Sequence, residues 1–216
     1  MSHDCNDHII KDGKLVRDFE AMYQNFKDPW NQEANYKNEY GPNLALCAIK
    51  ILIKNISKHI DKVLDIGCAS GYHAPAFLDL PCKKYIGTDI SKTIINKANF
   101  NNKDPRISFK SEDVLTSFSS LHENQYDLVF CAGTLYYVAP EIASGIVLNN
   151  IFKYCKKDGL FAYVYNSRAG QSFTDKWITL PEIRNKLADY FEEVFFCEVK
   201  LKDNEIVSIG ILKRND

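Results

Sequence analysis

Hydrophobic positions recur with two different spacings along this chain. In one segment, Leu46, Ile49, Ile53 and Ile56 lie three or four residues apart, which predicts an amphipathic helix over Leu44–His59. After it, short β-branched runs alternate with segments that have the pattern of helices or loops. Such alternation predicts right-handed crossovers and a parallel sheet that is covered by helices on both faces. The predicted strands are Lys62–Ile66, Tyr85–Thr88, Arg106–Lys110, Tyr126–Cys131 and Leu160–Tyr165.

The C-terminal part of the chain departs from this alternation. A helix is predicted over Pro181–Phe191, and apolar runs follow over Val194–Leu201 and Ile206–Lys213 with a polar turn at Lys202–Glu205 between them. Two strands joined by such a turn predict a β-hairpin, which would form an antiparallel edge of the sheet. Before the fifth strand, Lys156–Asp158 is predicted to be a helix end and a turn.

The N-terminal part has neither pattern. From Leu15 to Asn43 the sequence is polar but rich in aromatic residues, without the alternation of a strand. Gly41 and Pro42 then mark a boundary. We therefore predict one domain over residues 1–216, in which residues 1–43 form an aromatic-rich appendage and residues 44–216 form the core.

The composition is that of an ordinary globular protein. Of the 216 residues, 45% are hydrophobic and 25% are charged, which excludes a disordered or collagenous chain. The 27 Lys and Arg residues nearly balance the 28 Asp and Glu residues, so the formal net charge is -1. Because no global field would attract polyanions, we expect a small-molecule partner and neither a nucleic acid nor a membrane.

The cysteines and the N-terminus indicate a compartment. Seven cysteines form no C-x-x-C pair, so neither a disulfide framework nor a zinc site is predicted, and free thiols fit a reducing cytoplasm. Asp4, Asp7 and Asp12 occupy the place where an export signal would need a basic flank and an apolar run. The apolar stretches are far shorter than the roughly 20 residues that span a bilayer. We expect a cytoplasmic protein, and the sequence leaves its oligomeric state open.

The clearest candidate for a binding site is the segment Val63–His73. A buried strand runs into small residues at positions 67, 69, 70 and 71 and then into a predicted helix. In a doubly wound sheet, ligands bind at the carboxyl ends of the strands, near the switch in strand order. The small residues let a ligand approach the backbone, and a helix N-terminus offers free amide donors. Asp65 adds a carboxylate that could hold an ammonium group.

Spacing distinguishes between two kinds of cofactor. A dinucleotide fingerprint requires G-x-G-x-x-G, but this loop has Tyr72 where the third glycine should be, which disfavours a pyrophosphate. Asp89 lies 24 residues after Asp65, at the end of the second strand, where a carboxylate can accept both hydroxyls of a ribose. Glu112 and Asp113 follow the third strand and could accept from an exocyclic amine. Three acidic strand ends around one small-residue loop favour a cationic nucleoside.

These residues and their spacing resemble class I S-adenosylmethionine-dependent methyltransferases. The resemblance extends from Lys62 to Lys213 and includes the loop, the acidic strand ends, the Asp158-Gly159 turn and the terminal hairpin. It implies a Rossmann-like α/β fold of seven mostly parallel strands, S-adenosylmethionine as the cofactor and S-adenosylhomocysteine as the product. Ala69 departs from the glycine that is usual in the family and implies a slightly tighter loop. The implied cofactor-binding residues are Asp65, Gly67, Cys68, Ala69, Ser70, Gly71, Asp89, Ile90, Glu112, Asp113, Val114, Cys131 and Ala132.

The loop after the fourth strand, Cys131–Val138, faces the acceptor in this family. It has no Asn-Pro-Pro-Tyr sequence, which argues against a planar amino group as acceptor, and no carboxylate at the strand end for a metal, so we expect no metal. Its Leu-Tyr-Tyr-Val part, together with Lys27-Asp28-Pro29-Trp30 and Tyr36, resembles nodulation-type N-methyltransferases that act on amino sugars. This resemblance implies a hydroxyl or an amine of a sugar or sugar-derived metabolite as the acceptor, and a lid function for the appendage.

Candidate catalytic and acceptor-binding residues follow from proximity to this loop. Methyl transfer from a sulfonium is an in-line displacement, so a base is needed only if the attacking atom arrives protonated. His73, Tyr136 and Tyr137 are the catalytic candidates, although His73 could instead start a helix and Tyr137 could be an aromatic wall. The acceptor-binding candidates are Trp30, Tyr36, Tyr40 and Glu141. Glu141 could instead stabilise the first turn of a helix, where acidic residues are favourable. The three aromatic residues could instead pin a terminal helix to the core.

Three other functions stay open. The loop spacing and the terminal hairpin oppose a nicotinamide-dependent oxidoreductase. A non-catalytic nucleoside-binding protein would keep the pocket without turnover. A protein or RNA methyltransferase is the third alternative, which neither the charge balance nor a basic, aromatic-laced segment favours.

Overall fold

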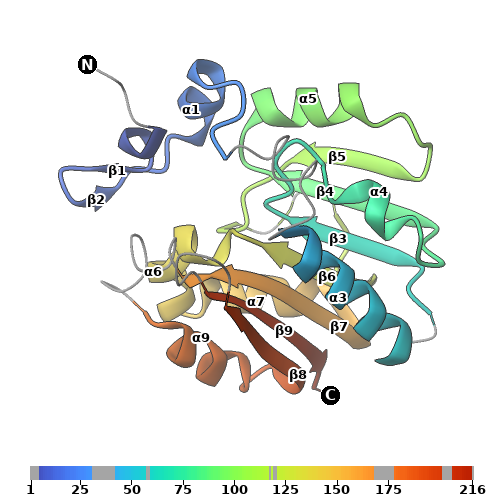
Figure 1. Cartoon of the computed structure of the whole chain (residues 1–216). Helices are drawn as coiled ribbons and strands as arrows, with labels where there is room; N and C mark the ends of the chain where they lie inside the picture. Colours follow the sequence, from blue (N-terminus) through green and yellow to red (C-terminus); the bar gives the residue numbers. More distant parts are fainter. Residues whose placement is uncertain are drawn as a thin grey trace.

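A seven-stranded mixed sheet forms the centre of the protein (Figure 1). The structure is a computed structural model that describes residues 5–30, 42–56, 59–116, 118, 121–167, 178–200 and 206–215, without the side chains of residues 42–45 and 47. The strand order is β5-β4-β3-β6-β7-β9-β8. These strands are β3 (Lys62–Ile66), β4 (Lys84–Asp89), β5 (Ile107–Ser111), β6 (Tyr126–Ala132), β7 (Cys155–Asn166), β8 (Phe191–Lys200) and β9 (Ile206–Arg214).

The strand directions follow the prediction from sequence. The five strands from β3 to β7 pair in parallel, whereas β9 pairs antiparallel with both β7 and β8. The chain runs outward from β3 to β5 and then returns to β6 on the other side of β3, so the strand order reverses at β3. The predicted Rossmann-like fold with a C-terminal antiparallel hairpin is confirmed.

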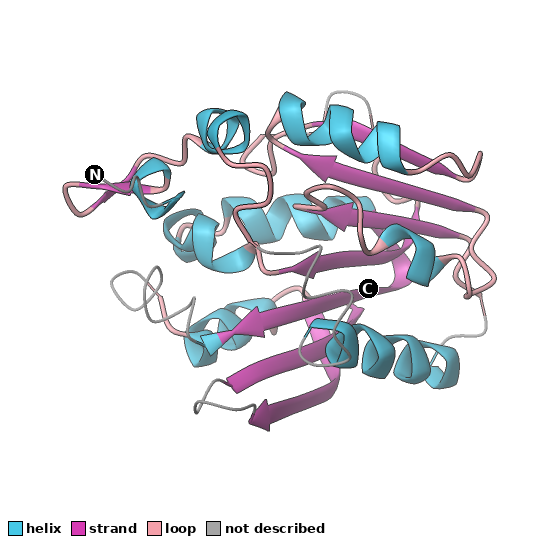
Figure 2. Ribbon diagram, turned by 45° about the horizontal axis from the view of Figure 1, so that its top comes forward, coloured by secondary structure: helices cyan, strands magenta, loops and turns pink. Residues whose placement is uncertain are grey.

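Helices cover both faces of the sheet (Figure 2). They are α3 (Pro42–Ile56), α4 (Ala74–Phe77), α5 (Lys92–Asn101), α6 (Ala139–Ala143), α7 (Ile146–Tyr154) and α9 (Leu180–Leu187). Side chains of α3 and α4 join the core cluster of one face, and those of α6, α7 and α9 join the cluster of the other. Helix α5 contributes to both clusters. None of the helices in the described part of the chain is long and apolar enough to cross a membrane.

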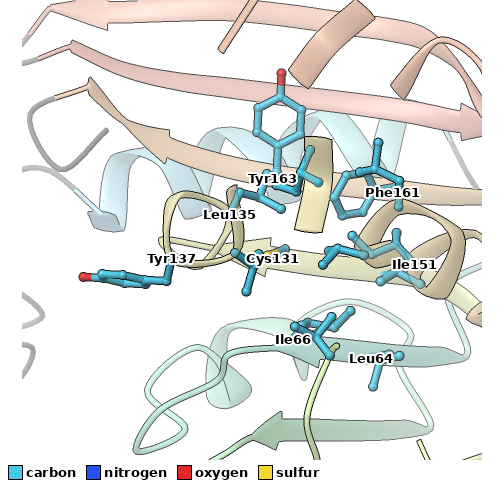
Figure 3. Close-up of a cluster of buried hydrophobic side chains, with 14 of the residues drawn as sticks. Leu64, Ile66, Cys131, Leu135, Tyr137, Ile151, Phe161 and Tyr163 are labelled. Carbon is cyan, nitrogen blue, oxygen red and sulfur yellow. The ribbon is translucent and has the colours of Figure 1, made fainter. Parts of the chain in front are cut away.

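The central strands are buried on both faces, which explains why their sequences are almost continuously apolar. Side chains alternate between the faces along each strand. Leu64 and Ile66 therefore join Cys131 and Phe161 in one core cluster, which Figure 3 shows, whereas Val63 joins the cluster of the opposite face. The core clusters on the two faces of the sheet thus hold β3, β4 and β6 side by side, with their carboxyl ends at the same edge.

The N-terminal part has more regular structure than the sequence predicts. A 3-10 helix (Cys5–His8), the antiparallel strands β1 (Ile10–Lys11) and β2 (Lys14–Leu15), and α1 (Phe19–Asn25) precede the sheet. Asp12 and Gly13 join β1 to β2 with positive φ angles of 52° and 74°, which is the backbone of a tight hairpin turn. The Asp-Gly pair is the signal in the sequence that could have revealed this hairpin.

Several predicted boundaries differ from the structure, and two of these differences have a clear physical reason. The segment Lys156–Asp158, predicted as a helix end and a turn, lies inside β7, where the pairing with β6 shifts register. Asp158 has a positive φ of 60°, so the strand bulges there and locally resembles a turn. The helix predicted over Pro181–Phe191 ends at Leu187, because Phe191 is buried in the core as the first residue of β8. The polar turn predicted between β8 and β9 lies outside the described residues.

Asp127 holds the amino ends of three neighbouring strands together. Its buried carboxylate belongs to β6 and lies next to the first residues of β3 and β7. Oδ2 accepts hydrogen bonds from the Asp61 and Lys62 amides at 3.1 and 2.9 Å, and Oδ1 accepts one from Lys156 Nζ at 2.5 Å. Hydrogen bonds to an ionised group are stronger than neutral ones. Side chains as well as strand pairing therefore fix the amino edge of the sheet.

Replacing Asp127 by Ala should lower the free energy of unfolding by about 2–4 kcal/mol, because two amides and an ammonium group lose a charged acceptor. Urea denaturation followed by circular dichroism measures this change. Asp79→Ala is the control, because its exposed carboxylate pairs with Lys50 near the surface and such pairs contribute little. Equal losses in the two variants would contradict the role given to Asp127.

Candidate functional site

The loop of residues 67–71 leaves β3 with a left-handed backbone. Gly67 and Gly71 have positive φ angles of 73° and 77°. A Cβ atom on Gly67 would lie 2.0 Å from Thr134 Oγ1, so no larger residue fits there without a shift. The Gly67 amide donates to the Thr88 carbonyl at 2.8 Å. The loop is thus held between β4 on one side and the loop after β6 on the other.

Ala69 has a left-handed conformation in the same loop, with φ of 46°. For an L residue with a side chain this conformation costs roughly 1–2 kcal/mol. It directs the Ala69 amide toward β4, where the amide donates to Asp89 Oδ2 at 3.1 Å. The residue at which the sequence departs from the usual glycine is therefore a strained residue that joins two strand ends.

Asp89 is the last residue of β4 and faces the loop. Its two carboxylate oxygens accept hydrogen bonds from the Ala69 and Ser91 amides, each at 3.1 Å. Burial raises the pKa of Asp89 to about 6, although the amide hydrogen bonds act in the opposite direction. Each oxygen keeps a second lone pair, so Asp89 can accept the two hydroxyls of a ribose, which is the contact predicted from the sequence.

Asp65 lies one residue before the end of β3 and is completely buried. Its Oδ2 accepts a hydrogen bond from the Tyr85 hydroxyl and lies 3.3 Å from His73 Nδ1. Within the described residues, Oδ1 has no hydrogen-bond partner. A buried carboxylate oxygen without a partner is costly. This position therefore fits a cationic group, such as the ammonium of a methionyl moiety.

The residues after β5 pack beside Asp89. The Glu112 amide donates to the Asp89 carbonyl at 3.0 Å, and the Asp113 carboxylate accepts from the Leu115 amide at 2.9 Å. Val114 is buried, which suits the predicted contact of this turn with an adenine ring. The structure thus brings together the three acidic strand ends that the sequence grouped.

His73 lies apart from the two tyrosines with which the sequence grouped it. Its ring packs against Phe130, 5.3 Å away between ring centroids, in the layer of α3 and α4. Tyr136 and Tyr137 belong to the core cluster of the opposite face. The position of His73 beside Asp65 favours a role in orienting that carboxylate, and a direct catalytic role stays a prediction.

Tyr137 is the centre of an aromatic group that the loop after β6 forms with the N-terminal segment. Its ring centroid lies 5.4 Å from Phe19, 5.6 Å from Trp30 and 4.6 Å from Tyr136. In Figure 3 its hydroxyl points away from the other labelled side chains. Burial raises the pKa of Tyr137 well above its usual range, so the hydroxyl stays protonated near neutral pH. The hydroxyl is hydrogen-bonded with Tyr136 and cannot serve as a ready base.

Residues 17–30, which we call the roof segment, are anchored on both sides of the switch point. Arg17 forms a two-pronged ion pair with Glu141 of α6, at 2.8 and 2.7 Å. Glu20 of α1 accepts hydrogen bonds from the Ser91 and Thr93 hydroxyls, at 2.7 and 2.6 Å. Because α5 follows β4 and α6 follows β6, the roof segment connects the cofactor side of the sheet with the acceptor side. Figure 1 shows α1 beside α5.

Three residues of the roof segment were missed as site residues. They are Arg17, Glu20 and Tyr23, whose buried hydroxyl accepts a hydrogen bond from Trp30 Nε1 at 2.8 Å. Arg17 and Glu20 contact residues 124 and 71 positions away, so no local pattern relates the partners. The weak signal for Tyr23 is its spacing of four residues from Phe19, which places both on one face of a helix. Glu141 is engaged by Arg17, and its predicted contact with an acceptor stays a prediction.

The other predicted site residues lie around the loop. Cys68, Ser70 and Cys131 are buried, Ala132 is half-buried and Ile90 is exposed. Burial raises the pKa of the Cys131 thiol to about 12, so it stays neutral. Tyr36 and Tyr40 lie outside the described residues. Within the part of the chain that the structure describes, no three His, Cys, Asp or Glu side chains are grouped so that they could hold a metal ion.

A family model described as a methyltransferase domain matches residues 57–205 of the chain. Solved structures of methyltransferases have a similar fold, and two of them serve as examples. The N-methyltransferase NodS from Bradyrhizobium japonicum, in complex with S-adenosylhomocysteine, aligns with a TM-score of 0.68 at 19% identity, over 88% of this chain and 94% of that chain. A TehB-like methyltransferase from Corynebacterium glutamicum aligns with a TM-score of 0.67 at 18% identity, over 90% and 99%.

Curated relatives match a shorter part of the chain. The tRNA U34 carboxymethyltransferase of Helicobacter pylori strain J99 is 33% identical over 91 residues, which are 40% of this chain and 34% of that protein. The enzyme of the same name from Sulfurimonas denitrificans is 25% identical over 109 residues, 50% of this chain and 36% of that protein. The chain spans about a third of the length of these relatives.

These relatives correct one prediction. The expectation that the partner is not a nucleic acid is contradicted by relatives whose names state a tRNA substrate, at low identity and over part of the chain. The expectation relied on the net charge of -1, which sums over the whole chain. A sum reports nothing about the charge beside a site or about recognition by stacking and hydrogen bonds.

Substitutions in the loop should separate its two left-handed positions. Gly67→Ala should destabilise the protein by about 1–3 kcal/mol, because its Cβ would meet Thr134. Ala69→Gly should change stability by less than about 1 kcal/mol, because relief of strain offsets the greater freedom of the unfolded chain. Thermal and urea unfolding measure both changes. A larger loss for Ala69→Gly than for Gly67→Ala would contradict this account of the loop.

Binding of S-adenosylhomocysteine, the predicted product, should weaken as the pH falls through about 6. Ribose hydroxyls favour the ionised carboxylate, whereas Asp89, with a pKa of about 6, is mostly protonated in the free protein at pH 5. The dissociation constant should rise about tenfold between pH 7 and pH 5, measured by calorimetry. Asp89→Asn should bind weakly at both pH values with little dependence on pH. A wild-type affinity that does not change with pH would remove Asp89 from the ribose site.

Proposed function

Because this chain belongs to the methyltransferase domain family, with the class I S-adenosylmethionine-dependent fold, we propose that it transfers a methyl group to a polar acceptor beneath the roof segment. The family, enzyme class and cofactor predicted from the sequence are confirmed by the family match. The observation that carries the proposal is the meeting of Asp65 and Asp89 at the loop of residues 67–71. There, a buried oxygen of Asp65 that has no partner among the described residues lies near Asp89, whose carboxylate can accept the hydroxyls of a ribose.

The cofactor side of the site binds by charge and hydrogen bonds. S-adenosylmethionine supplies a methyl group on a positively charged sulfur, which is a good leaving group. In this proposal Asp65 holds the ammonium group and Asp89 accepts the ribose hydroxyls. Glu112, Asp113 and Val114 border the adenine. His73 orients Asp65 through the contact of 3.3 Å.

The acceptor side of the site positions the attacking atom. Alignment supplies much of the rate of an in-line displacement. The hydroxyl of Tyr137 is hydrogen-bonded with Tyr136 and stays protonated, so it does not remove a proton. The two rings form an aromatic wall that positions the acceptor. Trp30 packs against Tyr137. In this proposal, the appendage of residues 1–43 acts as a lid on the core of residues 44–216 and excludes water from the acceptor site.

A nucleoside of tRNA is the first candidate acceptor. It is supported by the curated relatives, which are named as tRNA U34 carboxymethyltransferases. Their name states a tRNA acceptor and a carboxymethyl group, so they support the class of acceptor and not the group that is transferred. Enzymes that act on a base turn it out of the strand and stack it on aromatic side chains. The rings of Trp30 and Tyr137 are side chains of this kind beside the acceptor loop.

A hydroxyl or an amine of a sugar or sugar-derived metabolite is the second candidate. It is favoured by the two anchors of the roof segment, Arg17 to Glu141 and Glu20 to Ser91, which close the site on both sides. An acceptor small enough to be enclosed suits such a site. The resemblance of Lys27-Asp28-Pro29-Trp30 to nodulation-type enzymes points the same way.

A labelling experiment distinguishes the two acceptors. The full chain is incubated with S-adenosylmethionine carrying a radioactive methyl group, together with tRNA or with a panel of amino sugars and sugar nucleotides. We expect label in a tRNA nucleoside after nuclease digestion, because the curated relatives act on tRNA. Asp89→Ala should reduce the label at least tenfold through loss of the ribose contact.

Each result has one interpretation. Label that enters only the sugars would reject the tRNA acceptor and support the second candidate. A chain that binds S-adenosylhomocysteine but labels neither class would contradict methyl transfer to both acceptors.

A further inference from the structure

Two carboxylates from distant parts of the chain meet the same serine. Ser91 is completely buried and caps α5, where its hydroxyl accepts a hydrogen bond from the Ile94 amide at 3.3 Å. The Ser91 amide donates to Asp89 Oδ1 at 3.1 Å, and its hydroxyl donates to Glu20 Oε2 at 2.7 Å. One residue therefore connects the proposed ribose-binding carboxylate of β4 with the roof segment.

Glu20 completes the N-terminal cap of α5 from outside that helix. Its carboxylate accepts hydrogen bonds from the Thr93 hydroxyl at 2.6 Å and from the Thr93 amide at 3.3 Å. The first amides of a helix lack partners within the helix, and its positive end attracts a carboxylate. The hydrogen bonds from Ser91 and Thr93 lower the pKa of Glu20 to about 2, so Glu20 is ionised throughout the neutral range. The roof segment thus docks on α5 through a charge-assisted contact.

The second anchor of the roof segment is separate from the cofactor side. Arg17 pairs with Glu141 at the start of α6, which follows the acceptor loop. The two anchors therefore contact different halves of the proposed site. A substitution of Glu20 should weaken binding of the cofactor more than binding of the acceptor.

We propose that Glu20 is a positioning residue for the cofactor, which holds Ser91 and thereby fixes the turn that presents Asp89. The inference rests on the proposed function. A ribose bound to Asp89 would order this turn, and an ordered turn gives Glu20 a fixed partner. Cofactor binding and closure of the roof segment then favour each other by the same factor, because coupling between two sites is reciprocal. The aromatic wall of the acceptor site would be completed after the cofactor is bound.

Three variants of the full chain test the inference. Glu20→Gln keeps the size of the side chain without its charge, and Thr93→Val keeps the shape of its partner without the hydroxyl. Asp104→Asn is the matched control. Asp104 also accepts charge-assisted hydrogen bonds that lower its pKa to about 2, but it receives them from Arg106, between α5 and β5.

Calorimetric titration with S-adenosylhomocysteine is the first measurement. Glu20→Gln and Thr93→Val should raise the dissociation constant about five- to tenfold, whereas Asp104→Asn should change it less than twofold. The thermal midpoint of each free protein is measured in parallel. A loss of stability alone would lower that midpoint without this selective loss of affinity.

Hydrogen exchange of the α1 amides is the second measurement. S-adenosylhomocysteine should slow exchange over residues 19–25 in the wild type and in Asp104→Asn, and should not slow it in Glu20→Gln. A purely structural role for Glu20 would leave the ligand-dependent protection in place.

The outcomes separate this inference from the proposed function. Equal affinity and equal protection in the wild type and in Glu20→Gln would overturn the inference and leave the methyltransferase proposal intact. A wild type that does not bind S-adenosylhomocysteine would overturn the proposed function itself. If Glu20→Gln does not fold, Thr93→Val decides, because it leaves the carboxylate in place and removes only one of its donors.

Discussion

The hydrogen bond from the Ala69 amide to the Asp89 carboxylate joins the ends of β3 and β4, and the rest of the site is arranged around it. For Ala69 to donate, the loop must take a left-handed backbone, which requires glycine at position 67 beside Thr134. The Asp89 carboxylate that accepts this hydrogen bond lies at the end of β4, where partial burial raises its pKa to about 6. A strained loop and a desolvated carboxylate thus hold each other in a geometry that a ligand can complete.

The roof segment brings together parts of the site that the sheet keeps apart. The residues predicted to bind the cofactor follow β3, β4 and β5, and the predicted acceptor loop follows β6, on opposite sides of the switch point. Glu20 and Arg17 contact one side each, and Trp30 packs against Tyr137 between them. Met22 and Tyr23 of the same segment are buried in the core cluster of one face. Apolar packing therefore holds the roof segment in place together with its two polar anchors.

The sheet and the position of the acidic strand ends could be predicted because both depend on local spacing. Apolar runs define the strands, and the carboxyl ends of parallel strands meet at one edge, so Asp65 and Asp89 lie at the same loop. Their roles in binding a cofactor stay a prediction. The contacts of the roof segment could not be predicted, because Glu20 and Ser91 are 71 positions apart and no periodicity relates them. His73 shows the converse limit. It is close to the loop in sequence, but its ring packs in the layer opposite to the tyrosines. The net charge failed as a guide to partners because it carries no information about position.

Asp127 fixes the amino edge of the sheet, at the far end of the strands from Asp65 and Asp89. The amino ends of these strands therefore stabilise the fold, and their carboxyl ends present the residues proposed to bind ligands. In many folds, binding residues likewise lie on loops that a rigid framework positions. Chimeric proteins could therefore be built on this sheet. The N-terminal segment and the loop after β6 could be replaced by those of another family member, which would test whether these two parts determine the acceptor while the sheet stays unchanged.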